Sequence, residues 1–97
     1  MILKKIQWYI DAIEEELDGA ATYAEKYFLN KGWSTDWAKK YSTMANDELR
    51  HAEYMKQIGE EHIKMLGNLP DEDVEAWECC IKHYTEKYAA IMLLLSR

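Results

Sequence analysis

The sequence has little of what breaks a helix, with one proline and four glycines among its 97 residues. Proline removes a backbone donor and glycine weakens a helix interior, so their scarcity predicts a few long helices. The chain also has only two cysteines, the neighbours Cys79 and Cys80. Adjacent cysteines bridge each other only with strain, so we expect reduced thiols in a cytoplasmic protein.

The chain also lacks an excess of positive charge. Twelve Lys and Arg residues stand against eighteen Asp and Glu residues, which gives a formal net charge of −6. Because phosphate binding needs a basic patch, we expect no nucleic-acid partner. The apolar run from Ala89 to Leu95 is too short to cross a bilayer, and no signal-peptide pattern follows Met1, so we expect no membrane partner.

What is present is typical of one folded domain. Hydrophobic residues make up 48% of the chain and charged residues 31%, the balance of an ordinary globular protein rather than a disordered one. A chain of this length is near the lower limit for burying a useful core alone. We therefore predict a single domain over residues 1–97, of the all-α class.

Two groups of turn-forming residues divide the chain. The first is Asn30-Lys31-Gly32, in which Gly32 suits the left-handed conformation that often ends a helix. N-cap candidates from Ser34 to Asp36 follow it. The second is Gly67 to Pro70, followed by the acidic run Asp71 to Asp73, which suits the first turn of a helix. These signals predict helices at about 3–30, 35–67 and 71–95.

Within each predicted helix, residues that face a bundle core recur at alternating spacings of three and four. In the first helix this stripe comprises Leu3, Ile6, Ile10, Ile13, Leu17, Ala20, Ala24 and Tyr27. In the second helix it comprises Trp37, Tyr41, Met44, Glu48, His51, Met55, Ile58 and His62. The short connection between these helices predicts an antiparallel hairpin. We expect the third helix to cover one side and a second copy to complete a four-helix bundle, with a self-contained three-helix bundle as the alternative.

Two polar residues interrupt the stripe of the second helix, Glu48 and His51. They are one turn apart, so their side chains project from the same face. A carboxylate and an imidazole in a bundle core are costly unless they are paired or bind a metal. The spacing Glu-x-x-His therefore indicates either two metal ligands or a structural hydrogen-bonded pair that sets helix register.

Three glutamates of the first helix, Glu14, Glu15 and Glu16, are candidates to meet this pair. Glu16 lies 14 positions before residue 30, and Glu48 lies 13 positions after residue 35, so an antiparallel hairpin brings them to about the same height. Glu14 flanks the stripe on its other side and is the alternative, while Glu15 points most nearly to solvent. Two-fold pairing would give four carboxylates and two imidazoles, a set that suits two iron or two manganese ions.

Two segments resemble the ferritin-like superfamily. Glu15 to Tyr23 is similar to the first ferritin-like helix, in which a ligand Glu is followed seven places later by Tyr. Asn46 to Glu53 resembles the second helix, with the Glu-x-x-His-Ala signature of ferritins and rubrerythrins. The resemblance covers residues from about 10 to 66. It is nearest to half-length members such as encapsulated ferritins, in which a dimer rebuilds the bundle inside a protein compartment.

This resemblance implies roles for four residues. Glu16, Glu48 and His51 would be iron ligands, Glu48 would bridge the two ions, and Tyr23 would orient a ligand through a hydrogen bond. It also implies ferroxidase or related di-iron oxidase activity, in which two Fe(II) per dimer reduce dioxygen or peroxide and leave as Fe(III). The chain has no second Glu-x-x-His, so one copy would hold half of the site. The alternative is a metal-free helical module for oligomerisation or interaction.

The remaining histidines and aromatic residues have structural interpretations. His62 is expected to be a satisfied core or edge histidine, with an ion-entry point formed with Glu61 as the alternative. His83 is expected at the surface. The four tryptophans and seven tyrosines are expected to supply the core and an interface. The acidic runs, including Asp71 to Asp73, are expected to be solvated.

Overall fold

The computed structural model describes residues 3–97, and all regular structure within them is helical. Helix α1 spans Lys4–Asn30, α2 spans Thr35–Leu66 and α3 spans Asp71–Leu95. These bounds confirm the three predicted helices to within one residue at each end. Within the described part of the chain, no helix is both long enough and apolar enough to span a bilayer.

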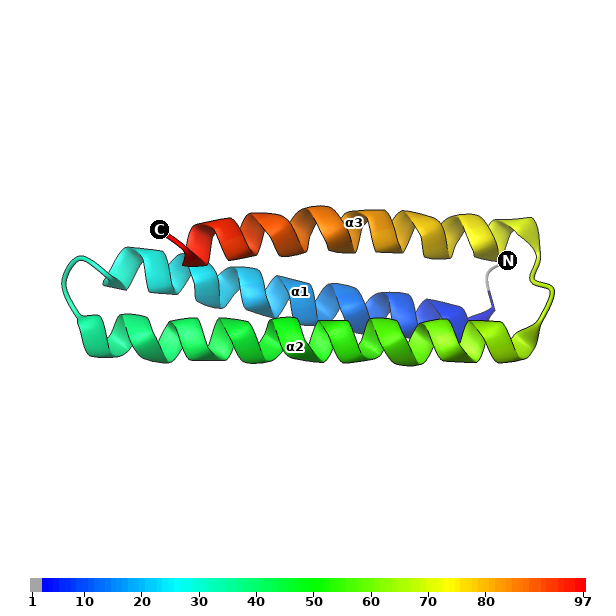
Figure 1. The fold of residues 1–97 in the computed structure, drawn as a ribbon, viewed down its shortest axis with the longest axis horizontal. Helices are drawn as coiled ribbons and strands as arrows, with labels where there is room; N and C mark the ends of the chain where they lie inside the picture. The colour runs from blue at the N-terminus through cyan, green and yellow to red at the C-terminus, as the bar shows by residue number, and fades with distance from the viewer. Residues whose placement is uncertain (1–2) are drawn as a thin grey trace.

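The helices lie side by side in a rod with extents of 52 × 18 × 17 Å (Figure 1). Helices α1 and α2 form the predicted antiparallel hairpin, and α3 returns alongside α1, running in the same direction as α1 (Figure 1). Most of the contacts that α3 makes are with α1 rather than α2. The all-α hairpin with a third helix is therefore confirmed, while the closure of a four-helix bundle by a second copy stays a prediction.

The two helix breaks use different backbone geometry. The Ser34 side chain accepts a hydrogen bond from the backbone N–H of Trp37 at 3.3 Å, which makes Ser34 the N-cap of α2. The expectation that Gly32 is left-handed is wrong, because α1 ends at Lys31 in a right-handed conformation with φ −59°. The left-handed glycine is Gly67 at the end of α2, with φ 76°.

The buried face of α2 differs from the predicted stripe by one position. The predicted stripe residues Trp37, Met44 and Ile58 are 54%, 39% and 41% exposed. The residues of α2 that are buried are mostly small: Ala38, Ala45, Leu49, Ala52 and Gly59. Small residues allow two helix axes to approach closely, so the hairpin buries this face and turns the larger side chains outward. One position on a helix is about 100° of rotation, which accounts for the shift.

The core-facing stripe predicted for α1 is largely confirmed. Six of its members are buried and form one core cluster with residues of the other two helices: Ile6, Ile10, Ile13, Leu17, Ala20 and Ala24. Helix α3 contributes Cys80 and Ile91 to this cluster. The expectation that the acidic run is solvated is wrong for Asp73, which is fully buried in the first turn of α3.

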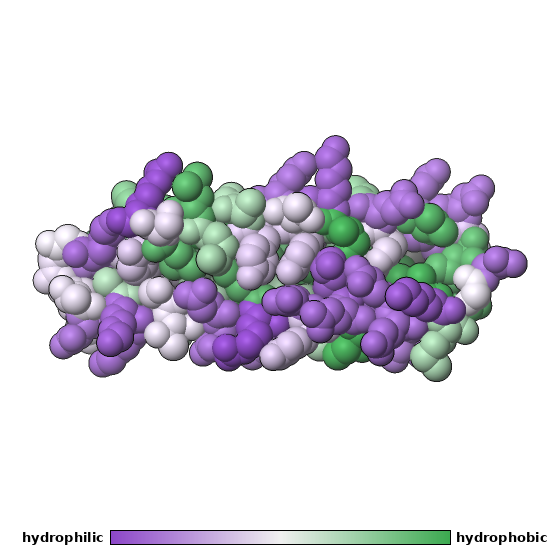
Figure 2. Space-filling model, viewed as in Figure 1, coloured by the Kyte–Doolittle hydropathy of each residue, from purple (hydrophilic) through white to green (hydrophobic). Residues whose placement is uncertain are grey.

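Three of the four tryptophans lie outside the core of the single chain, so the expected core role is wrong for them, while the expected interface role stays a prediction. Trp8, Trp33 and Trp37 are 59%, 74% and 54% exposed. Trp77 packs on the backbone of Gly59, where an added Cβ would lie 2.6 Å from the indole ring. Other apolar side chains also reach the surface, and Figure 2 shows hydrophobic patches among the charged residues of the face in view.

Candidate metal centre

Three metal-ligating side chains meet on one face of the hairpin. Glu16 of α1 and Glu48 and His51 of α2 each offer one ligand atom, and these atoms lie within 4.8 Å of one another. Glu16 Oε2 lies 3.5 Å from His51 Nδ1. The three residues that the hairpin register predicts to meet, one on α1 and two on α2, thus lie close together in the folded chain.

The cluster lies at the surface of the single chain rather than in its core. Glu16 and Glu48 are half-buried and His51 is exposed, with 50% of the His51 side chain accessible. Glu48 and His51 therefore lie outside the core of the single chain, and their burial in the core of a two-copy bundle stays a prediction. They lie beside the buried alanine face of α2, on its outer edge, because the hairpin packs through those small residues.

One oxygen of the cluster lacks a hydrogen-bond partner, although the imidazole of His51 lies within ion-pair distance of it. Glu16 Oε2 is buried and accepts no hydrogen bond from any residue between 3 and 97. Ionised carboxylates can only accept hydrogen bonds, so neither Glu16 nor Glu48 can satisfy the other while both are charged. The oxygen becomes satisfied when the two carboxyl groups share a proton or when a cation takes the place of that proton.

The pKa of Glu48 reflects how strongly the cluster favours a bound proton when no cation is present. The hydrogen bond that a protonated Glu48 can donate to Glu16, the burial of Glu48, and the negative charge of Glu16 together raise the pKa of Glu48 from 4.5 to about 7, while His51 acts in the opposite direction. A negative charge on Glu16 opposes the loss of the proton from Glu48. Glu48 therefore holds its proton to a higher pH than an ordinary glutamate.

Gly19, which no pattern described above identifies as a site residue, makes space for Glu48. A Cβ added at Gly19 would lie 3.1 Å from Glu48 Oε2, so the carboxylate rests over the bare backbone of α1. Gly19 lies one turn after Glu16, in the interior of a long helix. An isolated glycine in such a position costs helix stability and is the signal that could have identified it.

Tyr23 lies one turn beyond Gly19 on the same flank. Its ring stacks on that of Tyr41, with ring centroids 6.4 Å apart and an interplanar angle of 25°. Among residues 3–97, no hydrogen bond joins Tyr23 to Glu16, Glu48 or His51. In the single chain, the orienting hydrogen bond implied for Tyr23 is not formed.

The other candidate residues lie apart from the cluster. His62 is hydrogen bonded through Nδ1 to the hydroxyl of Tyr9, which confirms the prediction of a satisfied edge histidine. His83 is exposed on α3, as predicted. Glu14 lies on the other flank of α1, where it lines a hollow together with Cys80. Of the three candidate glutamates, Glu16 is therefore the one that meets Glu48.

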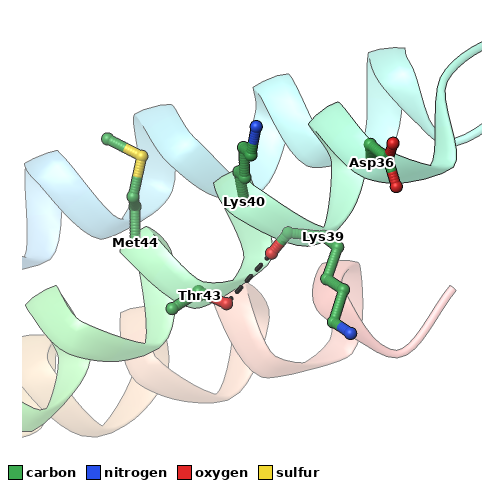
Figure 3. Close-up of a pocket in the computed structure, with 5 residues that line it drawn as sticks. All are labelled: Asp36, Lys39, Lys40, Thr43 and Met44. Carbon is green, nitrogen blue, oxygen red and sulfur yellow. Dashed lines mark hydrogen bonds between the residues drawn. The ribbon is translucent and has the colours of Figure 1, made fainter.

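A larger surface hollow, of about 610 Å³, does not coincide with the cluster. It is lined by Asp36, Lys39, Lys40, Thr43 and Met44, and all five side chains project from α2 alone (Figure 3). The Thr43 hydroxyl donates a hydrogen bond to the Lys39 carbonyl at 3.0 Å. This hollow is the open side of one helix and gathers no group of metal-ligating residues.

No protein-family model, curated protein or solved structure matches this chain. The grounds for a functional proposal are therefore the residues of the cluster, their geometry and their surroundings.

Proposed function

We propose that this chain is a half-length ferritin-like protein, in which two copies pair and hold two iron ions at their interface, where Fe(II) is oxidised. The single observation that carries the proposal is the convergence of Glu16, Glu48 and His51 within 4.8 Å, in the register that the hairpin requires. Both cysteines are free, which supports a reducing compartment such as the cytoplasm.

The donor set fits a hard divalent cation. Two carboxylates and one imidazole per chain suit Fe(II), with Mn(II) as the alternative. A cation would give the buried Oε2 of Glu16 a partner and would take the place of the proton on Glu48. His51, at the exposed side of the cluster, would supply the nitrogen ligand. Three protein donors leave such an ion incompletely coordinated, so the site is unfinished in one copy.

The surroundings of the cluster supply a reason for pairing. Helix α3 packs on the other flank of the hairpin, where Lys87 forms an ion pair with Asp18. The side that carries Glu48 has no covering helix in the described chain. At helical spacing from Glu48 along α2 lie Trp37, Met44 and Ile58, which are 54%, 39% and 41% exposed. A second copy that covers this face would bury these side chains and supply a second set of ligands.

The residues of the chain have distinct parts in this proposal. Bound iron would supply the electrons that reduce dioxygen or peroxide. Glu48 would release its proton on metal binding, and its negatively charged carboxylate would bridge the two ions. Glu16 would hold a second carboxylate in place from α1, and Gly19 would leave the space that the Glu48 carboxylate occupies.

The test is an anaerobic Fe(II) titration of the metal-free protein followed by a pulse of oxygen. We expect saturation at about one Fe(II) per chain and rapid oxidation, both lost in Glu48→Gln. The matched control is Glu15→Gln, which removes a neighbouring exposed carboxylate that lies outside the cluster. Binding no stronger than in Glu48→Gln would refute the proposal, and Mn(II) competition would show which metal the site prefers.

A metal-free interaction module is the second candidate, and one observation favours it. A proton shared between Glu16 and Glu48 can satisfy the pair without a metal, as the raised pKa of Glu48 indicates. In that case Glu48→Leu would change the oligomeric state measured by light scattering, and iron would have no effect on it. If the metal function is correct, Glu48→Leu would abolish iron binding and leave pairing intact or stronger.

A further inference from the structure

Three further side chains of metal-ligating types lie on the flank of α1 that faces α3, where they share a hollow although their donor atoms are not gathered as closely as those of the Glu16 cluster. There a surface hollow of about 280 Å³ opens between the two helices. It is lined by Gln7, Ile10, Glu14, Ala76, Cys79, Cys80 and His83. Among these residues are a carboxylate from α1 and a thiol and an imidazole from α3, at the same hollow.

Two of these donors share one face of α3. Cys79 and His83 are four positions apart, so their side chains lie one turn from each other on the same side of the helix. Both are exposed, as is Glu14. None of the three makes a hydrogen bond or ion pair within residues 3–97, so each is free to turn toward a ligand in the hollow.

The register of α1 and α3 places the third donor at the same height. The two helices run in the same direction (Figure 1), and Lys87 of α3 forms an ion pair with Asp18 of α1. One turn earlier on each helix stand His83 and Glu14. The imidazole of His83 and the carboxylate of Glu14 therefore stand at the same height on the two helices, and Cys79 lies one turn before His83 on α3.

We propose that Glu14, Cys79 and His83 bind one zinc-class ion that joins α1 to α3. Thiolate, imidazole and carboxylate are the ligands that Zn²⁺ takes in tetrahedral sites, with water in the fourth position. This set is softer than that of Glu16, Glu48 and His51, so the two sites select different metals. Cys80 is 5% exposed and belongs to the core, which leaves Cys79 as the thiol ligand.

Binding has a chemical and a mechanical consequence. The Cys79 thiol releases its proton to solvent when the sulfur binds the ion. Because the ligands come from two helices, the ion links α3 to the hairpin and stabilises the folded chain by mass action. This inference does not depend on the iron site, since it uses no residue of the Glu16 cluster.

The experiment is a Co²⁺ titration of the reduced, metal-free protein, in which a thiolate ligand produces a charge-transfer absorption band in the near ultraviolet. We expect this band at about one equivalent per chain, its loss in Cys79→Ser, and affinity at least about tenfold weaker in His83→Ala and Glu14→Gln. Zn²⁺ should displace Co²⁺ and raise the melting temperature of the wild type by several degrees but not that of Cys79→Ser.

Two controls separate this site from its neighbours. Cys80→Ala and His51→Gln should keep the band, because the first alters only the buried thiol and the second only the Glu16 cluster. The proposal is overturned by three results: no thiolate band in the wild type, a band that persists in Cys79→Ser, or saturation at one ion per two chains. The third result would assign the thiolate to a contact between copies.

Discussion

The two flanks of α1 carry the same residue type in different surroundings. Glu14 and Glu16 are two positions apart, which is about 200° of rotation on a helix, so they face nearly opposite directions. Glu16 meets Glu48 and His51 on the uncovered side of the hairpin. Glu14 lines a hollow that α3 closes on one side with two cysteines and a histidine. The comparison shows that the ligand groups available beside each glutamate depend on which helix packs against that flank of α1.

The largest expected effect, on the α3 flank, is the difference in reaction rate between the thiols of Cys79 and Cys80. Burial, with the nearby charges of Glu14 and Cys79, raises the pKa of Cys80 to about 11, while Cys79 is exposed. Since the thiolate is the reactive form, we expect Cys80 to react with a disulfide reagent on the order of 100-fold more slowly than Cys79 at pH 8. Thiol titration of Cys79→Ser and Cys80→Ala measures each rate. Equal rates in the folded protein would contradict the burial of Cys80.

The next largest effect concerns the contact between Gly59 of α2 and Trp77 of α3, which helps to hold α3 against the hairpin. An added methyl at Gly59 would lie 2.6 Å from the Trp77 ring, which is too close for any side-chain contact. Gly59→Ala should therefore push Trp77 away and lower the free energy of unfolding by about 1–3 kcal/mol. Urea unfolding followed by tryptophan fluorescence gives the value. A second variant, Gly59→Ala with Trp77→Leu, should recover part of the loss, and no recovery would argue against this contact.

On the uncovered flank, a smaller effect follows from the Glu48 pKa of about 7. Folding raises this pKa above 4.5, so the folded state favours the protonated carboxyl. The stabilisation is complete below pH 4.5 and is lost as the pH rises through 7. Glu48→Gln imitates the protonated form. In the presence of a chelator at pH 8, its free energy of unfolding should therefore exceed that of the wild type by on the order of 1 kcal/mol, after discounting for solvent screening.

Thermal melts at pH 4.5 and pH 8 test this dependence. The two proteins should differ little at the lower pH, and Glu15→Gln should follow the wild type at both. A stability difference that is the same at the two pH values would mean that Glu48 titrates normally. Adding Mn(II) or Fe(II) should reverse the order at pH 8, because the metal binds the ionised form.

The smallest expected effect on stability is at Gly19, the counterpart of Gly59 on the open flank. An added Cβ would lie 3.1 Å from Glu48 Oε2, the movable end of a flexible side chain. Alanine also favours the helix over glycine by about 1 kcal/mol, so Gly19→Ala should change the unfolding free energy by less than about 1 kcal/mol in either direction. Fe(II) affinity should nevertheless fall roughly tenfold, and unchanged affinity would show that Glu48 binds no metal in this position.

Local signals in the sequence predicted much of the fold. The scarcity of proline and glycine, the break around residues 30–34 and the acidic run after Pro70 predicted three helices whose ends lie within one residue of those observed. The register that brings Glu16 to Glu48 was also predictable. Counting residues from a short turn is sufficient in a hairpin, because both helices rise by the same distance per residue.

Which face of α2 is buried was not predictable from side-chain size. The spacing of the large residues Trp37 and Met44 predicts that they face the core, yet the hairpin packs through Ala45 and Ala52. A pattern of apolar residues identifies a stripe to within about one position, whereas the closest approach of two backbones decides between neighbouring stripes. This choice moved Glu48 and His51 from the core to the surface of the single chain.

The sequence by itself determined the helices, their order and the height at which Glu16, Glu48 and His51 meet, because these follow from local propensity and chain connectivity. Only the tertiary structure decided that α3 covers the Glu14 flank, that Gly19 makes room for the Glu48 carboxylate, and that the Glu48 pKa rises to about 7. The physical reason is that burial, contact and charge interactions act through space, between residues whose separation in the chain does not fix their distance.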